Sequence, residues 1–500
     1  MNITIGSFER VKSKVDLLVA GMFEGDAKPP LVLKKLDGTA FQLVQSAIKN
    51  KRFSGKKDEQ FHGYLDSLRS SNEILVLGLG KKENWKYEPA RRATAGALNF
   101  ANANKLKSIR ILAECFLGGA VKLEDVAFLI SQTIDLATYK FDRYQTKEEL
   151  KPKRTVESVE ILFSQLSKKK EMTQMIEEGR LIAGAVNFAR DLINEPGNRL
   201  QPRQLADCAR DLAKESGFRS EVLGIAELKK NNMNGILAVA QGSHQSPQLI
   251  VLEYGVSHKR NGTICLVGKG VTFDSGGISL KPSGGMEKMK CDMSGAAAVL
   301  GTMKAISKLK LKIHVVAVIP CVENMPGGGA QRPGDIIKMH NGKSVEVINT
   351  DAEGRLILAD ALSYTKRFNP KSVIDLATLT GACSVALGDR AIGLMGTDPK
   401  LVDQVRKAGE RSGERCWELP LWDEYADLIK GHHSDLLNAG SGQAGTIVGG
   451  MFLKEFVPVK SWAHLDIAST AWTDANKPYH VKGGSGVGVR LLVELLKNWK

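Results

Sequence analysis

The chain alternates short apolar segments with segments of helical periodicity over most of its 500 residues. In the last two thirds, strand-like runs lie at 263–268, 313–319, 344–348, 372–379 and 462–467, with helical patterns after Asp292 and Arg355. This order brings successive strands together in parallel and places helices on both faces of the sheet. The sequence therefore predicts an α/β fold with a mostly parallel central sheet, whose ligand sites form at the carboxyl ends of the strands.

A smaller α/β domain is predicted at the N-terminus. Its runs at 16–20, 73–78, 108–113 and 158–163 resemble strands, and 89–105 and 124–139 have helical spacing. Another helical pattern, over 171–193, ends at Asn194-Glu195-Pro196-Gly197-Asn198, where proline and glycine stop a helix. We expect an N-terminal domain over 1–165, a connecting helix over 166–195 and a catalytic domain over 196–500.

Charge and composition narrow the functional classes. The net charge is +15, and residues 1–170 hold 30 Lys and Arg against 20 Asp and Glu, so 30 − 20 = +10 lies in the first third. This excess suits a solvated surface or a nucleic-acid partner. No run approaches the ~20 apolar residues of a membrane span, and the run at 17–23 is too short for a signal peptide. The seven cysteines are scattered. We expect a cytoplasmic protein with no membrane partner.

Ionisable residues gather directly after predicted strands or before predicted helices. The four segments concerned are Gly268-Lys269-Gly270-Val271-Thr272-Phe273-Asp274-Ser275-Gly276-Gly277 with Lys281, Met289-Lys290-Cys291-Asp292, Asn349-Thr350-Asp351-Ala352-Glu353-Gly354-Arg355, and Ala377-Thr378-Leu379-Thr380-Gly381-Ala382. Each segment has an ordinary structural explanation. Asp292, Asp351 and Glu353 suit the N-terminal ends of helices, and Lys269 and Lys281 suit a solvated surface.

Taken together, the segments favour a metal site. Asp274, Asp292, Asp351 and Glu353 are expected to meet at one edge of the sheet, where four carboxylates would repel one another unless cations neutralise them. If the backbone from Asp351 to Glu353 is extended, both side chains point to the same face. Oxygen-rich clusters of this size suit two divalent metal ions. The sequence lacks His-Glu-x-x-His, Gly-x-x-x-x-Gly-Lys-Ser/Thr and Gly-x-Ser-x-Gly motifs.

These residues closely resemble the leucyl aminopeptidase family, the M17 cytosol aminopeptidases. The most specific match is Asn349-Thr350-Asp351-Ala352-Glu353-Gly354-Arg355-Leu356, accompanied by the segments around Asp274 and Thr378, by Glu323-Asn324-Met325-Pro326 and by Arg332-Pro333-Gly334-Asp335. The resemblance covers roughly residues 165–500. It implies a metal-dependent aminopeptidase that releases N-terminal residues from peptides and assembles as a homohexamer.

The resemblance also implies roles for individual residues. The tighter metal ion is held by Lys269, Asp274, Asp292 and Glu353, and the more exchangeable ion by Asp274, Asp351 and Glu353. Lys269 binds as the neutral amine, so metal binding releases its proton. Manganese and zinc both suit this ligand set.

The implied chemistry is attack by a bridging water that the two metal ions activate. Lys281 stabilises the oxyanion, and Arg355 holds a bicarbonate ion that acts as general base. The pocket for the first side chain, which prefers Leu and other apolar residues, is lined by Met289, Thr378, Leu379 and Gly381. Ser469 replaces the usual glycine of the family, and 438–446 also departs from its pattern.

Two other functions remain as alternatives. Some bacterial members of the family also bind DNA as regulators, and the basic N-terminal third is compatible with that additional role. A structural protein that kept the fold and lost catalysis is the other alternative. All predicted ligands, together with Lys281 and Arg355, are present, which argues against it.

Overall fold

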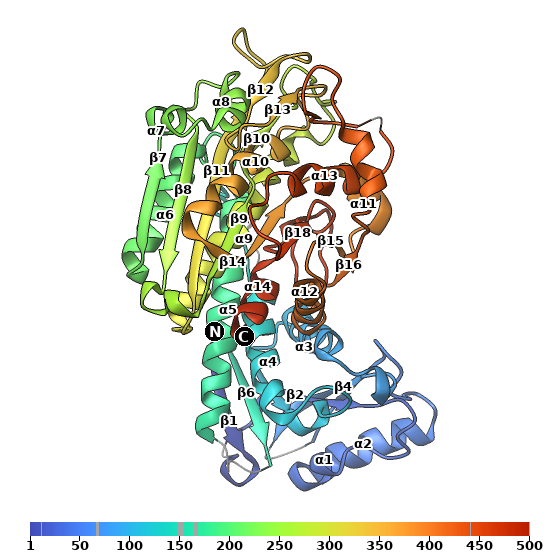
Figure 1. The fold of residues 1–500 in the computed structure, drawn as a ribbon. Helices are drawn as coiled ribbons and strands as arrows, with labels where there is room; N and C mark the ends of the chain where they lie inside the picture. The colour runs from blue at the N-terminus through green and yellow to red at the C-terminus, as the bar shows by residue number, and fades with distance from the viewer. Residues whose placement is uncertain (12, 67–69, 148–154, 165–168, 441, 500) are drawn as a thin grey trace. The chain divides into compact units, whose positions relative to one another are not determined.

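The computed structural model describes residues 1–11, 13–66, 70–147, 155–164, 169–440 and 442–499. It divides into two compact units, one of residues 1–184 and 476–481 and the other of residues 185–475 and 482–500. The division falls inside α5 (Lys169–Asn194), the helix predicted over 171–193 (Figure 1). The predicted domain limit at 165 lies outside the described residues.

The N-terminal unit contains a six-stranded sheet, parallel except where β3 joins β4. The four predicted strands are all present, and the two outermost strands were not predicted from the sequence. In sheet order the strands are β1 (Asn2–Ser7), β6 (Ser158–Phe163), β5 (Ser108–Leu112), β2 (Val15–Met22), β4 (Ser71–Gly78) and β3 (Gln60–Tyr64). The helices of this unit are α1 (Leu31–Leu36), α2 (Gly38–Lys49), α3 (Tyr87–Ala103) and α4 (Leu123–Ala137).

The second unit is built on a nine-stranded sheet that is parallel at its centre and antiparallel where β15 meets β18 and where β8 meets β11 and β7. This confirms the predicted α/β class with a mostly parallel central sheet. In sheet order the strands are β16 (Cys416–Glu418), β15 (Ile392–Gly396), β18 (Trp462–Asp466), β14 (Pro370–Ala377), β9 (Thr263–Gly268), β11 (His314–Asn324), β8 (Gln248–Tyr254) and β7 (Arg219–Leu223), with β10 (Gly270–Asp274) paired to β11.

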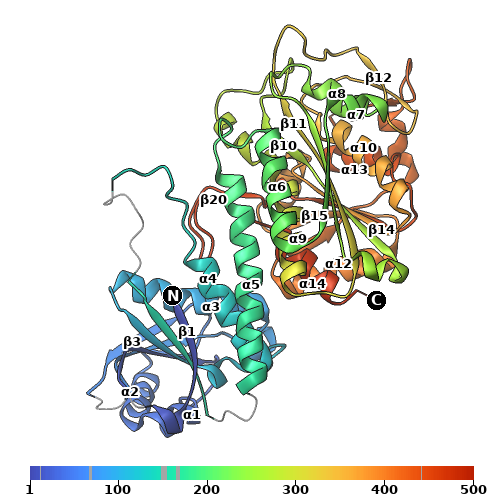
Figure 2. The ribbon, with the colours of Figure 1, turned by 90° about the vertical axis from the view of Figure 1, so that its left-hand side faces the viewer.

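Helices cover both faces of this sheet (Figure 2). The helices α6 (Pro202–Ser216), α9 (Ser294–Lys308), α12 (Pro399–Ser412) and α14 (Val489–Lys497) belong to one layer. On the opposite face, α8 (Asn234–Ala240), α10 (Gly354–Tyr364) and α13 (Gly445–Lys454) share an apolar core with β9, β11 and β14. Two short helices, α7 (Ile225–Lys230) and α11 (Gly381–Leu387), lie at the margins.

Two small sheets complete this unit, one of β12 (Ile336–Lys338), β13 (Ser344–Glu346) and β17 (Leu436–Leu437), the other of β19 (Trp472–Thr473) and β20 (Gly483–Gly484). All six residues of β9 are buried, as expected for a central parallel strand covered on both faces. Among the described residues, no helix is both long and apolar enough to cross a membrane.

A buried carboxylate fixes α10 against its neighbours. Asp360 is fully buried and accepts hydrogen bonds from the backbone N–H groups of Ile236 and His340, both at 3.0 Å. Burial raises the pKa of Asp360 to about 7, although these backbone hydrogen bonds act to lower it. Because the pKa is raised in the folded state, the stability that this group contributes is present below pH ~4 and is lost as pH rises through 7.

We predict that Asp360→Asn removes this loss, because an amide has the shape of the protonated acid and does not ionise. Relative to the unchanged chain, the variant should gain on the order of 2–3 kcal/mol in unfolding free energy between pH 5 and pH 8. Chemical denaturation at several pH values measures the difference. Ser363→Ala removes a hydroxyl of the same helix whose hydrogen bonds, among the described residues, go to backbone carbonyls of α10, and it should show no such pH trend. A constant difference for Asp360→Asn would contradict the assignment.

Candidate metal centre

Five of the predicted site residues lie at the ends of central strands or in the segments that lead into helices. Lys269 follows β9 directly, and Asp274 is the last residue of β10. Asp292 lies in the 3-10 helix Met286–Met293, and Asp351 and Glu353 lie in the turn that leads into α10. Because β9 and β10 both run parallel to β11, their carboxyl ends open at one edge of the sheet. The fold thus brings these segments together as the sequence analysis expected.

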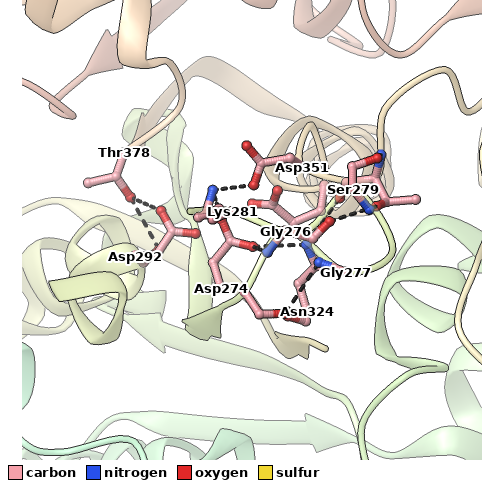
Figure 3. A network of polar contacts seen from close by, with 12 residues as sticks. Asp274, Gly276, Gly277, Ser279, Lys281, Asp292, Asn324, Asp351 and Thr378 are labelled. Carbon is pink, nitrogen blue, oxygen red and sulfur yellow. Dashed lines mark hydrogen bonds and ion pairs between the residues drawn. The ribbon is translucent and has the colours of Figure 1, made fainter. Parts of the chain in front are cut away.

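The carboxylates meet closely. Asp274, Asp351 and Glu353 each offer an oxygen within 4.8 Å of the others, an arrangement able to hold a metal ion. Figure 3 shows Asp274 and Asp351 beside the Lys281 ammonium, and Asp292 bonded to Thr378. Asp274, Asp292 and Glu353 are at most 5 % exposed. Such crowding of negative charge away from water is costly unless cations balance it.

Two lysines bridge the carboxylates. The Nζ atom of Lys269 lies 2.8 Å from Asp292 Oδ2 and 2.9 Å from Glu353 Oε1, and it donates to the Thr378 carbonyl at 2.9 Å. The Nζ atom of Lys281 lies 2.7 Å from Asp274 Oδ2 and also contacts Asp351. Each ammonium therefore occupies a place between two carboxylates, which is the place that a bound cation would take.

Burial and mutual charge shift the pKa values of this cluster. Burial raises the pKa values of Asp292, Asp351 and Glu353, and the charge of Asp274 adds to the effect on each. Burial acts to lower the pKa values of Lys269 and Lys281, but the surrounding carboxylates outweigh it and raise both above the ordinary range. The raised carboxylate pKa values show that nearby positive charge does not fully offset burial and mutual repulsion, and the raised lysine pKa values show that both ammonium groups are stabilised.

Several buried oxygens accept no hydrogen bond from the described residues. They are Asp292 Oδ2 and both carboxylate oxygens of Glu353. Buried polar atoms usually find a partner, so such atoms point to a bound ion or water. Two of them lie at ion-pair distance, 2.8 and 2.9 Å, from the Lys269 ammonium, which supplies part of the positive charge that these oxygens need. This set of oxygens, with the Lys269 amine, fits divalent cations that prefer oxygen and nitrogen ligands.

Of the helix-capping alternatives for the acidic residues, the one for Asp292 is wrong, and Glu353 has the N-cap position but not the capping hydrogen bond. The N-cap residue of α9 is Met293, and α10 has Glu353 at its N-cap without a side-chain capping bond. The expected extended backbone is also wrong, because Glu353 has α-helical angles of φ −77° and ψ −36°. Asp351 and Glu353 converge through a turn, in which the Asp351 N–H donates to Asn349 Oδ1 at 2.8 Å.

Asn324, at the end of β11, orients Asp274. Its Nδ2 donates to Asp274 Oδ1 at 2.8 Å and to the Thr350 carbonyl at 3.0 Å, and the Gly276 N–H donates to the same Oδ1 at 2.9 Å. One carboxylate oxygen of Asp274 is thereby fixed, and the other faces Lys281. The adjacent Gly277 has φ +66°, and an added Cβ would lie 2.8 Å from Asn324 Oδ1. Asn324 belongs to one of the family-like motifs of the sequence, but no role was predicted for it.

Asn438 joins the predicted metal-binding turn to Arg355. Its side chain accepts from the N–H groups of Ile348 and Asn349 at 2.7 and 3.2 Å and donates to the carbonyls of Asn349 and Ala352 at 2.7 and 3.3 Å. Its own carbonyl accepts from Arg355 Nη1 at 2.7 Å. Burial lowers the pKa of Arg355 to about 10, against the opposing charges of Glu353 and Asp466. Only a comparison of distant segments could have found Asn438, because no local pattern marks it.

The predicted pocket residues lie on two elements beside these carboxylates. Met289 is half-buried in the same 3-10 helix as Asp292. Thr378 and Leu379 follow β14 and are half-buried, and the Thr378 hydroxyl donates to Asp292 Oδ1 at 2.7 Å. Gly381 is exposed at the start of α11, with no atom within 4 Å of an added Cβ. Ser469, the departure from the family pattern, donates to the Ala391 carbonyl at 2.9 Å.

The whole chain matches known proteins. The model of the cytosol aminopeptidase family catalytic domain matches residues 187–493, and the model of the N-terminal domain of the same family matches residues 19–148. The chain belongs to the cytosol aminopeptidase family. The resemblance seen in the sequence is thereby confirmed, and the catalytic model covers every predicted site residue.

Individual relatives support the same family membership. A probable cytosol aminopeptidase of Geotalea uraniireducens is 45% identical over 93% of this chain and 94% of its own. One of Roseiflexus castenholzii is 44% identical over 100% of this chain and 99% of its own. Among solved structures, the bottromycin maturation enzyme BotP in complex with Mn has a TM-score of 0.83 and 32% identity, covering 97% of this chain and 99% of that one.

We predict that Asn438→Ala destabilises this family member by about 2–5 kcal/mol, because the buried Asn438 amide makes four part-buried hydrogen bonds, to two N–H groups and two carbonyls, that the variant loses. The matched control is Asn341→Ala. Asn341 is exposed and bonds to Glu455 and Lys343 in contact with solvent, so its loss should cost less than about 1 kcal/mol. Denaturant titration of both variants measures the two values. Equal values would show that Asn438 does not brace the site.

Proposed function

We propose that the chain is an aminopeptidase that uses two divalent metal ions, Mn²⁺ or Zn²⁺, to release N-terminal residues from peptides, with Leu and other apolar residues preferred. The observation that carries this proposal is the convergence of Asp274, Asp351 and Glu353 within 4.8 Å, next to the buried Lys269–Asp292 pair. Family membership supports peptide hydrolysis, and the Mn in the BotP complex supports manganese.

The proposed ligands divide between two sites. Lys269, Asp274, Asp292 and Glu353 would hold the tighter ion, and Asp274, Asp351 and Glu353 the more exchangeable one. When bound, the two ions supply Lewis acidity and lower the pKa of a water molecule toward neutrality. Lys269 would give up its proton in order to bind, so uptake of metal would release acid.

The remaining residues of the site handle the substrate. Lys281, 20 % exposed and adjacent to Asp274, would donate to the oxyanion that develops on the scissile carbonyl. Arg355 is buried, its Nη1 donates to the Asn438 carbonyl, and its Nε donates to no described residue. Its guanidinium suits a bicarbonate ion acting as general base. Met289, Thr378, Leu379 and Gly381 would line the pocket for the first side chain.

The family also supports proposals on assembly and location. We propose a homohexamer in the cytoplasm, because the relatives are named as cytosol aminopeptidases and the sequence motifs are those of a hexameric family. The comparisons favour peptide hydrolysis and do not support the additional DNA-binding role that the basic N-terminal third suggested.

We predict that hydrolysis of leucine amide disappears when metal is stripped and returns with Mn²⁺ or Zn²⁺. Asp351→Ala should lower kcat/KM at least 100-fold, because the exchangeable site loses a ligand. Asp423→Ala is the control, since the Asp423 side chain is 97% exposed and lies outside the predicted site. Full activity of the metal-free protein, or of Asp351→Ala, would refute the two-metal proposal.

A second prediction concerns Asn324. Asn324→Ala leaves Asp274 Oδ1 with a single backbone donor, Gly276. Loss of a residue that orients a metal ligand typically weakens metal affinity 10–100-fold. Activity measured against free Mn²⁺ concentration should shift by about that factor, with maximal activity less affected than the half-saturation point. Unchanged half-saturation would show that Asn324 has only a structural part.

A further inference from the structure

A row of buried polar side chains lies on β14 and β18, on the face of the central sheet covered by α10 and α13, next to the segment that carries Thr378 and Leu379. Asp375 of β14 pairs in register with His464 of β18. Asp466 lies two residues beyond His464, so its side chain points to the same face. Each of these three side chains is 0 % exposed. None has a role in the aminopeptidase chemistry proposed above.

At the inner end of this row, His464 contacts Asp375. His464 Nδ1 lies 2.5 Å from Asp375 Oδ1, and Trp462 Nε1 donates to Asp375 Oδ2 at 2.7 Å. Burial acts to lower the pKa of His464, but the charge of Asp375 and its hydrogen bond, together with Asp466, raise it. A positive His464 in turn favours the ionised form of Asp466, whose pKa burial raises.

At the outer end of the row, Asp466 is hydrogen-bonded to the segment that follows β14. Asp466 Oδ1 accepts from the Leu379 N–H at 3.2 Å and from the Ala468 N–H at 3.1 Å, and Oδ2 accepts from the Thr380 hydroxyl at 2.7 Å. The same hydroxyl accepts from the Cys383 N–H at 3.2 Å and so caps α11. Asp466 thus fixes both Leu379 and the start of the helix that follows it.

The segment that Asp466 holds also contacts the proposed metal ligands. Thr378, one residue earlier, holds Lys269 through its carbonyl at 2.9 Å and Asp292 through its hydroxyl at 2.7 Å. The Leu379 side chain packs against α13, where an added Cβ on Gly449 would lie 3.0 Å from Leu379 Cδ2. Leu379 therefore has little freedom, and its place is set by Asp466 behind it and α13 beside it.

We propose that Asp466 is a positioning residue that sets the shape of the pocket for the first side chain of the substrate, by holding Leu379 and Thr380 in place. The proposal rests on the aminopeptidase function proposed above. It predicts that loosening this contact weakens the discrimination between large and small apolar side chains, because that discrimination depends on a close fit and is worth only ~1–3 kcal/mol per methylene. Metal binding by the carboxylate cluster should be retained.

The test compares kcat/KM for leucine amide and alanine amide in the metal-loaded enzyme. Asp466→Ala should lower the leucine-to-alanine ratio at least fivefold. Thr380→Val, which removes one hydroxyl at nearly constant volume, should lower it in the same direction and carries the test if Asp466→Ala fails to fold. Thr380→Ser keeps the hydroxyl and should hold the ratio within twofold. Calorimetric binding of free leucine and free alanine should show the same loss of discrimination, with metal content per chain unchanged.

The control for substitution of a buried carboxylate elsewhere in this unit is Asp360→Asn, because Asp360 bonds to backbone N–H groups away from the pocket. It should leave the ratio unchanged. A ratio within twofold of the unchanged enzyme in both Asp466→Ala and Thr380→Val would overturn the inference, as would an equal fall in Asp360→Asn. An unchanged enzyme that does not hydrolyse leucine amide with any metal would overturn the aminopeptidase proposal and this one with it.

Discussion

The second unit is organised around a cluster of buried carboxylates whose negative charge exceeds the positive charge beside it. Four carboxylates, those of Asp274, Asp292, Asp351 and Glu353, converge at one edge of the central sheet, and three of them are almost completely buried. Two lysines face them in bridging positions, so 4 − 2 = 2 negative charges remain to be balanced by Arg355 and by bound cations. Without cations such a cluster would raise its own pKa values and weaken the fold.

The sheet makes this concentration of charge possible. Parallel strands β9, β10, β11 and β14 end at the same edge, and each contributes a ligand or a residue that orients one. The asparagines Asn324 and Asn438 then hold the ligand-bearing loops through several hydrogen bonds each. The rigid part of the site is therefore its backbone support, and the cations complete the charge balance.

The sequence predicted the central strands and the ionisable residues more fully than the edges and supports. The range 263–268 was correct because all six residues of β9 are buried and apolar or small. The strand β3 was missed because its residues are only partly buried and alternate weakly. The site residues could be found because each lies in a short, distinctive segment after a strand or before a helix.

The supports of the site could not be found in this way. Asn438 bonds to residues 83–90 positions away, and Asp466 bonds to Leu379 and Thr380 from 86–87 positions away. No periodicity or local motif records such pairings. The turn that brings Asp351 and Glu353 together was likewise not predicted. An extended backbone was assumed for the Asp-x-Glu spacing, and the spacing alone does not distinguish an extended segment from a turn.

The most direct test of the central claim is anomalous X-ray diffraction from crystals grown with Mn²⁺. The account predicts two anomalous peaks about 3.5–4 Å apart, one bounded by Lys269, Asp274, Asp292 and Glu353 and the other by Asp274, Asp351 and Glu353. A cluster that remained free of metal at millimolar Mn²⁺, with Lys269 and Lys281 still bridging the carboxylates, would contradict it.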